Sequence, residues 1–389
     1  MNAKTIAVKW HELFSRYAED LYPGRYTLTT CFELAEKGLE IKRLAKEKGS
    51  FIAVHNYLYP EFHEIADKVG DSLGLSFTVR EACAKRIDFE SVFFMGATAK
   101  IIVGDSAKVF TADHSSILGC SLVFGTDYQW IENWKKNNPE GILITYINSD
   151  VYTKSISHFI STSRNTDKII AYAAKLYPDR KILVLPDKFL GFVMKTRAIE
   201  ILKNEGMNIN QDLIDIYQYF KGEYRAACYV HAEIGPDAAE IAMLENNDAE
   251  LIIHPECGCA SSCLYKLQTG EIPNAKAYFL STEQMVEHAR NSHAKKFIVA
   301  TEKGMVYRLR KEIPGKEFIP ISEKAECRFM KANTFDKLLR SLMEDRLEIV
   351  LCDDCCDPKH PYEDEQVIHI QKSVARKSKE AIDKMLTIV

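Results

Sequence analysis

Three pairs of polar side chains could bind or protonate a small molecule, because each pair follows a short apolar run and its members lie two residues apart. The pairs are His55 with Tyr57 in "FIAVHNY", Tyr146 with Asn148 in "GILITYINS", and His254 with Glu256 in "AELIIHPEC". Positions i and i+2 of an extended chain point to the same side. One such pair could simply decorate the end of a strand. Three matching pairs favour a site built from three repeated units.

A serine follows each pair at a related distance. Ser72 and Ser163 lie 17 residues after the first member of their pair, and Ser281 lies 27 residues after His254. Each serine stands where we expect a strand to turn into a helix, and the first turn of a helix presents N–H groups that bind anions. N-capping alone would explain each serine equally well.

A cysteine closes each unit after a further apolar run. The three are Cys120 in "GCSLV", Cys228 in "CYVH" and Cys327 in "CRFMKANT", at 65, 82 and 73 residues from the first member of the pair. Alternating strands and helices make each unit a small layered α/β domain. We therefore predict an α/β fold of three pseudo-symmetric domains whose equivalent cysteines meet at the centre.

A rival set of cysteines is closely spaced, as in zinc sites and redox pairs. It comprises Cys257, Cys259, Cys263, Cys352, Cys355 and Cys356. The third unit has ten extra residues between its pair and its serine, and they fall across "CGCASSC". We interpret Cys259 and Cys263 as parts of an insertion. We interpret "CDDCCDPKHPYEDE" as an acidic, solvated loop that could also hold a labile disulfide or a metal ion.

Three thiolates, rather than four, would have a chemical consequence. A cubane iron–sulfur cluster normally takes four cysteine ligands, so three leave one iron open to polarise a hydroxyl or carbonyl group and to assist loss of water. Zinc could use the same three thiolates and an open position. The spacing leaves both metals open.

Composition limits the class of protein and its partners. The net charge is −4, 46% of residues are hydrophobic and 27% are charged, which is typical of a globular protein without a nucleic-acid surface. No apolar run approaches the roughly 20 residues that span a bilayer. The start "MNAKTIAVKWHELFSRY" lacks the apolar core of a signal peptide. We predict a cytoplasmic protein that binds neither nucleic acid nor membrane, in a compartment that keeps its eleven cysteines reduced.

Ordered motifs from about residue 26 to the C-terminus resemble the NadA-type quinolinate synthases in their longer form. They are "VHNYLYPEFHEIADKVGDSLGLS", "FMGATAK", "GCSL", "TYINS", "PDKFLG", "CYVH", "HPEC", "ATEKGMVYRLRKEIPGKEFIPI", "CRFMKANTFDKLLRSL" and "KEAIDKMLTIV". The resemblance implies a triangle of three αβα three-layer domains around a central 4Fe-4S cluster, with Cys120, Cys228 and Cys327 as ligands and one iron without a protein ligand. It implies domains at 1–137, 138–245 and 246–345, and an acidic loop and C-terminal helix at 346–389 that pack back on them.

The resemblance also implies an activity and residue roles. The enzyme would condense iminoaspartate with dihydroxyacetone phosphate to quinolinate in NAD biosynthesis, with loss of phosphate and two waters. An iminoaspartate-producing enzyme would be a functional partner. Proton transfers would fall to Tyr57, His254 and Glu256. Residues expected to bind and orient substrate groups are His55, Ser72, Tyr146, Asn148, Ser163, His231, Ser281 and Thr282.

The sequence departs from the family at "FMGA", where Gly96 and Ala97 replace the usual Ala and Glu, so a local contact should differ. An alternative function is a zinc- or thiol-based binding or sensing protein that uses the clusters at 257–263 and 352–356. Metal content separates the two hypotheses, because the first predicts about four iron atoms per chain and the second predicts zinc.

Overall fold

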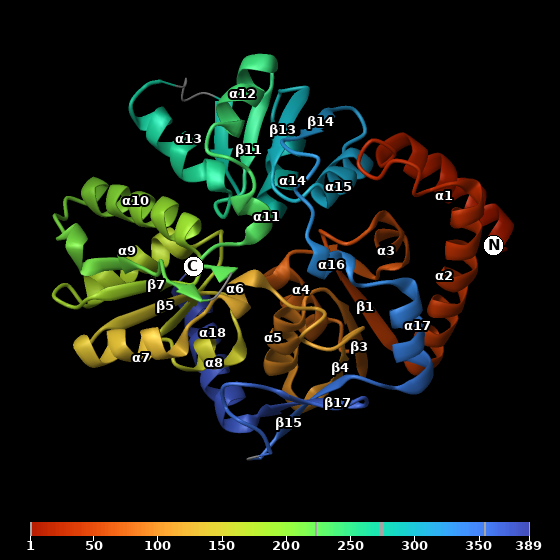
Figure 1. Ribbon diagram of the computed structural model, residues 1–389, viewed down its shortest axis with the longest axis horizontal. Coiled ribbons are helices and arrows are strands. Elements are labelled where there is room, and N and C mark those ends of the chain that lie inside the picture. The colour runs from red at the N-terminus through yellow and green to blue at the C-terminus, as the bar shows by residue number, and fades with distance from the viewer. Residues whose placement is uncertain (1, 222–223, 272–275, 354, 389) are drawn as a thin grey trace. The chain divides into compact units, whose positions relative to one another are not determined.

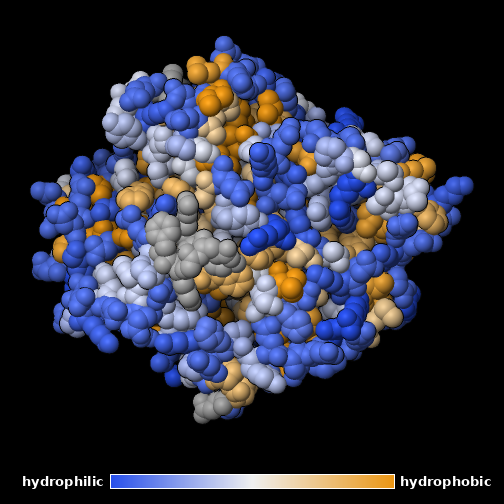
Figure 2. Space-filling view, viewed as in Figure 1, coloured by the Kyte–Doolittle hydropathy of each residue, from blue (hydrophilic) through white to orange (hydrophobic). Residues whose placement is uncertain are grey.

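The computed structural model describes residues 2–221, 224–271, 276–353 and 355–388. The chain forms two compact units, one of residues 1–119 and 286–372 and the other of residues 120–285 and 373–389. Parallel strands alternate with helices along the chain, which confirms the predicted α/β class (Figure 1). Within the described residues, no helix is both long enough and apolar enough to cross a membrane. Hydrophilic side chains cover most of the face seen in Figure 2.

The order of elements repeats three times. Each repeat reads strand, helix, strand, helix, strand, helix, strand and a one-turn helix. The first repeat is β1 (Ser50–His55), α3 (Pro60–Ile65), β2 (Lys68–Gly70), α4 (Ser72–Glu81), β3 (Arg86–Glu90), α5 (Phe93–Val103), β4 (Lys108–Phe110) and α6 (Ser121–Phe124).

The second repeat follows the same order. It is β5 (Ile142–Tyr146), α8 (Val151–Ser155), β6 (Phe159–Ser161), α9 (Thr166–Leu176), β7 (Ile182–Leu185), α10 (Lys188–Asn204), β8 (Ile214–Ile216) and α11 (Tyr229–Ala232). The third is β11 (Glu250–Ile253), α13 (Gly258–Gln268), β12 (Ala277–Phe279), α14 (Thr282–Asn291), β13 (Lys296–Ala300), α15 (Gly304–Glu312), β14 (Glu317–Pro320) and α16 (Arg328–Lys331).

The sheets are parallel within each repeat. The order is β2-β1-β3-β4 in the first and β6-β5-β7-β8 in the second; in the third, β11 pairs with β12 and β13 pairs with β14. The central strands β3 and β5 are buried along their whole length, as expected for parallel strands covered on both faces. The predicted triangle and the predicted domain boundaries stay predictions.

The remaining elements are not shared by the three repeats. In the first unit, β15 (Glu348–Cys352) runs antiparallel to β4, β17 (Val367–Gln371) pairs in parallel with β15, and β16 (Tyr362–Glu363) pairs with β17. The helices and short strands are α1 (Ala3–Tyr17), α2 (Leu28–Lys48), α7 (Tyr128–Asn137), α12 (Ala238–Glu245), α17 (Phe335–Glu344), α18 (Lys372–Ile388), β9 (Phe220–Lys221) and β10 (Tyr224–Arg225).

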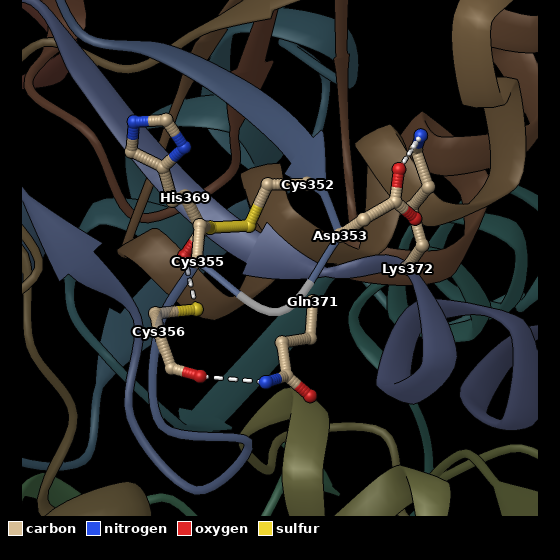
Figure 3. Close-up of a disulfide and its surroundings, with 7 residues drawn as sticks. All are labelled: Cys352, Asp353, Cys355, Cys356, His369, Gln371 and Lys372. Atoms are coloured by element: carbon tan, nitrogen blue, oxygen red, sulfur yellow. Dashed lines mark hydrogen bonds and ion pairs between the residues drawn. A yellow bond between two sulfur atoms is a disulfide. The ribbon is translucent and has the colours of Figure 1, made fainter.

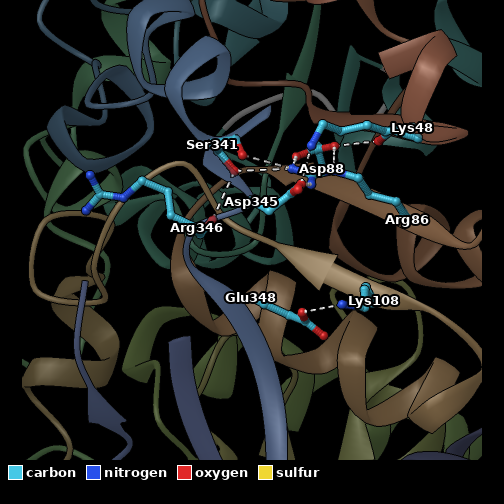
Figure 4. A network of polar contacts seen from close by, with 9 residues as sticks. Lys48, Arg86, Asp88, Lys108, Ser341, Asp345, Arg346 and Glu348 are labelled. Atoms are coloured by element: carbon cyan, nitrogen blue, oxygen red, sulfur yellow. Dashed lines mark hydrogen bonds and ion pairs between the residues drawn. The ribbon is translucent and has the colours of Figure 1, made fainter. Parts of the chain in front are cut away.

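A buried ion pair stabilises the first unit at the start of β3 (Figure 4). The guanidinium of Arg86 donates to the carboxylate of Asp88 at 2.8 Å and lies over the ring of Phe110. It also contacts Asp345 and the carbonyl oxygen of Ser341 at the end of α17. Because both members of the Arg86–Asp88 pair are buried, their mutual contact offsets the cost of removing two charges from water.

Candidate active site

Four polar side chains converge on the carboxyl group of Glu256 in the second unit. The Asn148 amide donates to Glu256 Oε1 at 3.0 Å and to the Tyr146 hydroxyl at 3.1 Å. The Nδ1 atoms of His231 and His254 lie 3.2 and 3.5 Å from Glu256 Oε2, and their rings stack with centroids 5.2 Å apart. All five residues were predicted from the sequence as site residues, and the structure brings them together.

The four residues of the two predicted pairs lie at or just past the ends of strands. Tyr146 is the last residue of β5, Asn148 follows it in the turn, and His254 and Glu256 come directly after β11. Each pair therefore stands just past the carboxyl end of a parallel strand, where α/β proteins bind their ligands, and β5 and β11 belong to two different sheets. His231 comes from the one-turn helix α11 that follows Cys228.

Burial sets the protonation states in this cluster. Desolvation, with a further contribution from the nearby Asp187 carboxyl, raises the pKa of Glu256 to about 8. Burial lowers the pKa of His231 to about 3. Near neutral pH the 3.2 Å contact between them is therefore a contact between neutral groups and not an ion pair. A protonated carboxyl that titrates near the working pH is suited to general acid catalysis.

A second group of predicted residues lies in the first unit. The backbone N–H of Tyr57 donates to His55 Nδ1 at 3.2 Å, and the Tyr57 hydroxyl lies 2.6 Å from Thr301 Oγ1. Burial, aided by the positive charges of Arg308 and Lys331, lowers the pKa of His55 to about 3. His55 is therefore a neutral imidazole at neutral pH.

Each predicted ligand cysteine is the N-cap of a one-turn helix: Cys120 for α6, Cys228 for α11 and Cys327 for α16. An equivalent backbone hydrogen bond is formed just before each cysteine in the chain. The N–H of Phe93, Lys188 or Lys303 donates to the carbonyl oxygen two residues before the cysteine, at 2.7, 2.7 and 2.8 Å. The three cysteines thus occupy the same position in three copies of one local structure.

The Ser121 hydroxyl holds two of these cysteines near each other in the second unit. It donates to the carbonyl oxygen of Ala227 at 3.4 Å and accepts the N–H of Tyr229 at 3.1 Å, so it contacts both neighbours of Cys228 in the chain. Ser121 itself follows Cys120. Two thiols held in this way suit a shared metal centre.

Among the residues that the structure describes, two groups of side chains could hold a metal ion. Cys228, His231 and Glu256 offer ligand atoms within 4.8 Å of one another in the second unit, and so do Cys352, Cys355 and Cys356 in the first. The first group contains one predicted cluster ligand. The second belongs to the closely spaced set. Burial raises the pKa of Cys327 to about 11, so this side chain is a neutral thiol until a metal takes its proton.

Two of the three serines predicted to bind anions lie at helix starts. Ser72 is the first residue of α4, Ser163 lies between β6 and α9, and Ser281 precedes Thr282 at the start of α14. Ser281 and Gln284 form a reciprocal cap, in which each side chain accepts the backbone N–H of the other.

Part of the extra length of the third repeat lies in a longer helix. α13 has 11 residues, whereas its counterparts α3 and α8 have six and five. Cys259 and Cys263 are buried on it as free thiols. This agrees with their interpretation as parts of an insertion.

Several residues beside the predicted site were not anticipated. Asp187 and Glu302 accept hydrogen bonds from the backbone N–H groups of Cys228 and Cys327. Lys331 donates to the carbonyl oxygen of Tyr57 and pairs with Glu302 at 3.2 Å. Aligning the three repeats would have revealed the two acids, because each stands two residues after the third strand of its repeat.

Comparison with known proteins gives a consistent result. A family model described as quinolinate synthetase A protein matches residues 39–387. The quinolinate synthase of Pyrobaculum aerophilum is 39% identical over 316 residues, which cover 81% of this chain and 94% of that protein. That of Thermus thermophilus is 33% identical over 349 residues, covering 90% and 96%. That of Mycolicibacterium paratuberculosis is 36% identical over 315 residues, covering 81% and 83%.

Proposed function

The chain belongs to the quinolinate synthase family, and on that premise we propose that it condenses iminoaspartate with dihydroxyacetone phosphate to quinolinate, releasing phosphate and two waters. Membership confirms the resemblance read from the motifs and makes the protein an enzyme of NAD biosynthesis. It favours this activity over a zinc- or thiol-based sensor. We place the reaction in the cytoplasm, coupled to an enzyme that produces iminoaspartate.

The observation that carries the proposal is the convergence of Tyr146, Asn148, His231 and His254 on the Glu256 carboxyl, beside the thiol of Cys228. Ring closure and dehydration need a proton donor close to a centre that polarises oxygen. A buried, protonated Glu256 meets the first need. The thiol of Cys228 is suited to bind a metal centre that polarises oxygen.

We propose that Cys120, Cys228 and Cys327 hold a 4Fe-4S cluster with one iron lacking a protein ligand. The Ser121 bridge supports the first two ligands, and the equivalent N-cap position supports the third. When bound, the open iron supplies a Lewis acid for a hydroxyl or carbonyl oxygen. The proposed fold around it is the triangle of three αβα domains.

The chain's own residues divide the remaining work. Glu256, His254 and Tyr57 move protons, and the hydroxyl of Thr301 fixes the orientation of Tyr57. His55, Tyr146, Asn148 and His231 orient carboxylates and carbonyls as neutral donors. Ser72, Ser163, Ser281 and Thr282 bind the carboxylates and phosphate, because helix starts favour negative charge.

Glu256→Gln tests the proposal, because it keeps the size and the hydrogen bonds of the side chain but removes its transferable proton. We expect anaerobic quinolinate formation to fall about 10²–10⁴-fold while iron content is unchanged. Cys259→Ala, at the start of α13 three residues after Glu256 and outside the site, should keep both turnover and iron content. Turnover of Glu256→Gln equal to that of the parent enzyme would remove Glu256 from this role.

A further inference from the structure

Three cysteines lie close together in the first unit, at and just after the end of β15 (Figure 3). Cys352 is the last residue of the strand, and Cys355 and Cys356 follow in the connection to β16. Their sulfur atoms all lie within 4.8 Å of one another. Cys352 and Cys355 form a disulfide, and Cys356 is a free, half-buried thiol. None of these residues takes part in the proposed reaction.

The neighbouring strand β17 fixes the backbone that carries these thiols. The Cys356 thiol donates to the carbonyl oxygen of His369 at 3.7 Å, and the Gln371 amide donates to the carbonyl oxygen of Cys356 at 2.6 Å. Cys352 stands opposite Gln371 in the parallel ladder. Lys372 and Asp353 form an ion pair at 2.7 Å on the other side of the connection (Figure 3). The thiol cluster is therefore held by a sheet and not only by a surface loop.

A histidine stands on the same face of this sheet. His369 pairs with Val350, two residues before Cys352, so its side chain and that of Cys352 share one face. Its Nδ1 atom is buried and has no hydrogen-bond partner within the described part of the chain. Imidazole nitrogen and thiolate sulfur are together the preferred ligands of zinc.

Reduction would turn the disulfide into two further zinc ligands. A dithiol reductant breaks the Cys352–Cys355 bond by thiol–disulfide exchange; its two electrons and two protons convert the cysteines to thiols, and it leaves as a disulfide. Cys352, Cys355 and Cys356 would then offer three thiolates on a Cys-x2-Cys-Cys spacing. Soft thiolates at this spacing select zinc over harder divalent ions.

We propose that Cys352, Cys355 and Cys356 form a zinc site that exists only when the Cys352–Cys355 disulfide is reduced, with His369 as its nitrogen neighbour. In the disulfide form two of the three ligands are withdrawn. Zinc binding at this place therefore reports the thiol redox state of the surroundings.

Site-resolved alkylation tests the proposal on the whole enzyme with its cluster. The protein is reduced anaerobically with a phosphine, which takes up oxygen from water as it cleaves the disulfide, and is then alkylated with iodoacetamide with or without Zn²⁺. Trypsin releases residues 347–359, which contain all three cysteines, and the mass of this peptide counts the alkylated thiols. Zinc should slow alkylation of the three together about tenfold or more, because metal-bound thiolates are poor nucleophiles, and a chelator should reverse this.

Two variants and one omission sharpen the result. Cys356→Ser should lose the zinc protection of Cys352 and Cys355, whereas Cys83→Ser, at an exposed free cysteine, should keep it. Without the reductant, Cys356 is the single reactive thiol of this peptide, and zinc should leave it unprotected. Equal alkylation rates with and without zinc in the reduced parent protein would overturn the proposal. Because the readout is a peptide mass and not a product, this failure would leave the proposed synthase activity untouched.

Discussion

The backbone N–H of Cys228 donates a hydrogen bond of 3.0 Å to the buried carboxyl group of Asp187. The other carboxyl oxygen accepts the N–H of Leu190 at 2.9 Å and so caps α10. Glu302 stands at the same step of the third repeat and accepts the N–H of Cys327 at 3.4 Å, while Val92 occupies this step in the first repeat. Two of the three proposed cluster ligands thus have their backbone held by a buried acid.

Replacing Asp187 with Ala should lower both cluster retention and stability. The change removes a helix cap and leaves the N–H of Cys228 unsatisfied, which together should cost about 2–4 kcal/mol in the free energy of unfolding. Iron content after desalting measures retention, and urea unfolding measures stability. Asp150→Ala is the matched control, because Asp150 caps α8 but contacts no cysteine backbone in the structure's hydrogen bonds. It should lose stability and keep its iron; equal iron in the Asp187 variant would refute a positioning role.

The pH dependence of turnover should report Glu256. Burial raises the pKa of this carboxyl to about 8, so the group carries its proton below that pH and loses it above. If Glu256 acts as the acid, the rate of quinolinate formation should fall as pH rises through about 8. Glu256→Gln should show only a low rate without this decline. A decline of the same shape in the variant would assign the titration to another group.

Glu90 should make the first unit less stable at high pH. Burial, with a further contribution from the negative charge of Asp88, raises its pKa well above the usual value, and its Oε2 has no hydrogen-bond partner among the described residues. The folded state therefore binds this proton more tightly than the unfolded chain, whose carboxyl titrates near 4.3. The contribution of Glu90 to the free energy of unfolding should be fully present below that pH and should fall as pH rises toward the folded-state value. Urea unfolding at pH 5 and pH 8 should show a smaller fall for Glu90→Gln. Glu348→Gln, at an acid paired with an exposed lysine, should match the parent protein.

Breaking the buried ion pair of β3 should be costly. Asp88→Asn leaves the Arg86 guanidinium buried with a weaker partner, and we expect a loss of about 3 kcal/mol in the free energy of unfolding. Lys108→Ala breaks the exposed pair with Glu348 seen in the same view (Figure 4) and should cost less than about 1 kcal/mol. Similar losses from both changes would show that burial does not decide the contribution of the Arg86–Asp88 pair.

The polar pairs at strand ends could be predicted from the sequence because their geometry is local. Side chains two positions apart in an extended chain point to the same side, and the carboxyl ends of parallel strands lie at one edge of their sheet. These two facts place Tyr146 with Asn148 after β5 and His254 with Glu256 after β11. The meeting of the two pairs also depends on tertiary packing, because the strands belong to different sheets. The insertion was also readable from the sequence, because it adds residues within one connection, where part of it lengthens α13.

The supporting residues could not be predicted in this way. Asp187, Glu302 and Ser121 act on backbone N–H and carbonyl groups far away in the chain, so their roles do not follow from local spacing. Only the equivalent positions of the two acids in their repeats could have drawn attention to them. The disulfide of Cys352 and Cys355 depends on β15 ending at Cys352 and on β17 holding the next residues. These are tertiary relationships, which spacing alone does not encode.

The most direct test of the central claim is to count iron and quinolinate in parallel, anaerobically, for the parent enzyme and for Cys120→Ala, Cys228→Ala and Cys327→Ala. We predict about four iron atoms and product for the parent enzyme, and loss of both in each of the three variants. Retention of iron in any one of them would contradict the shared three-cysteine centre and would move the metal to other residues.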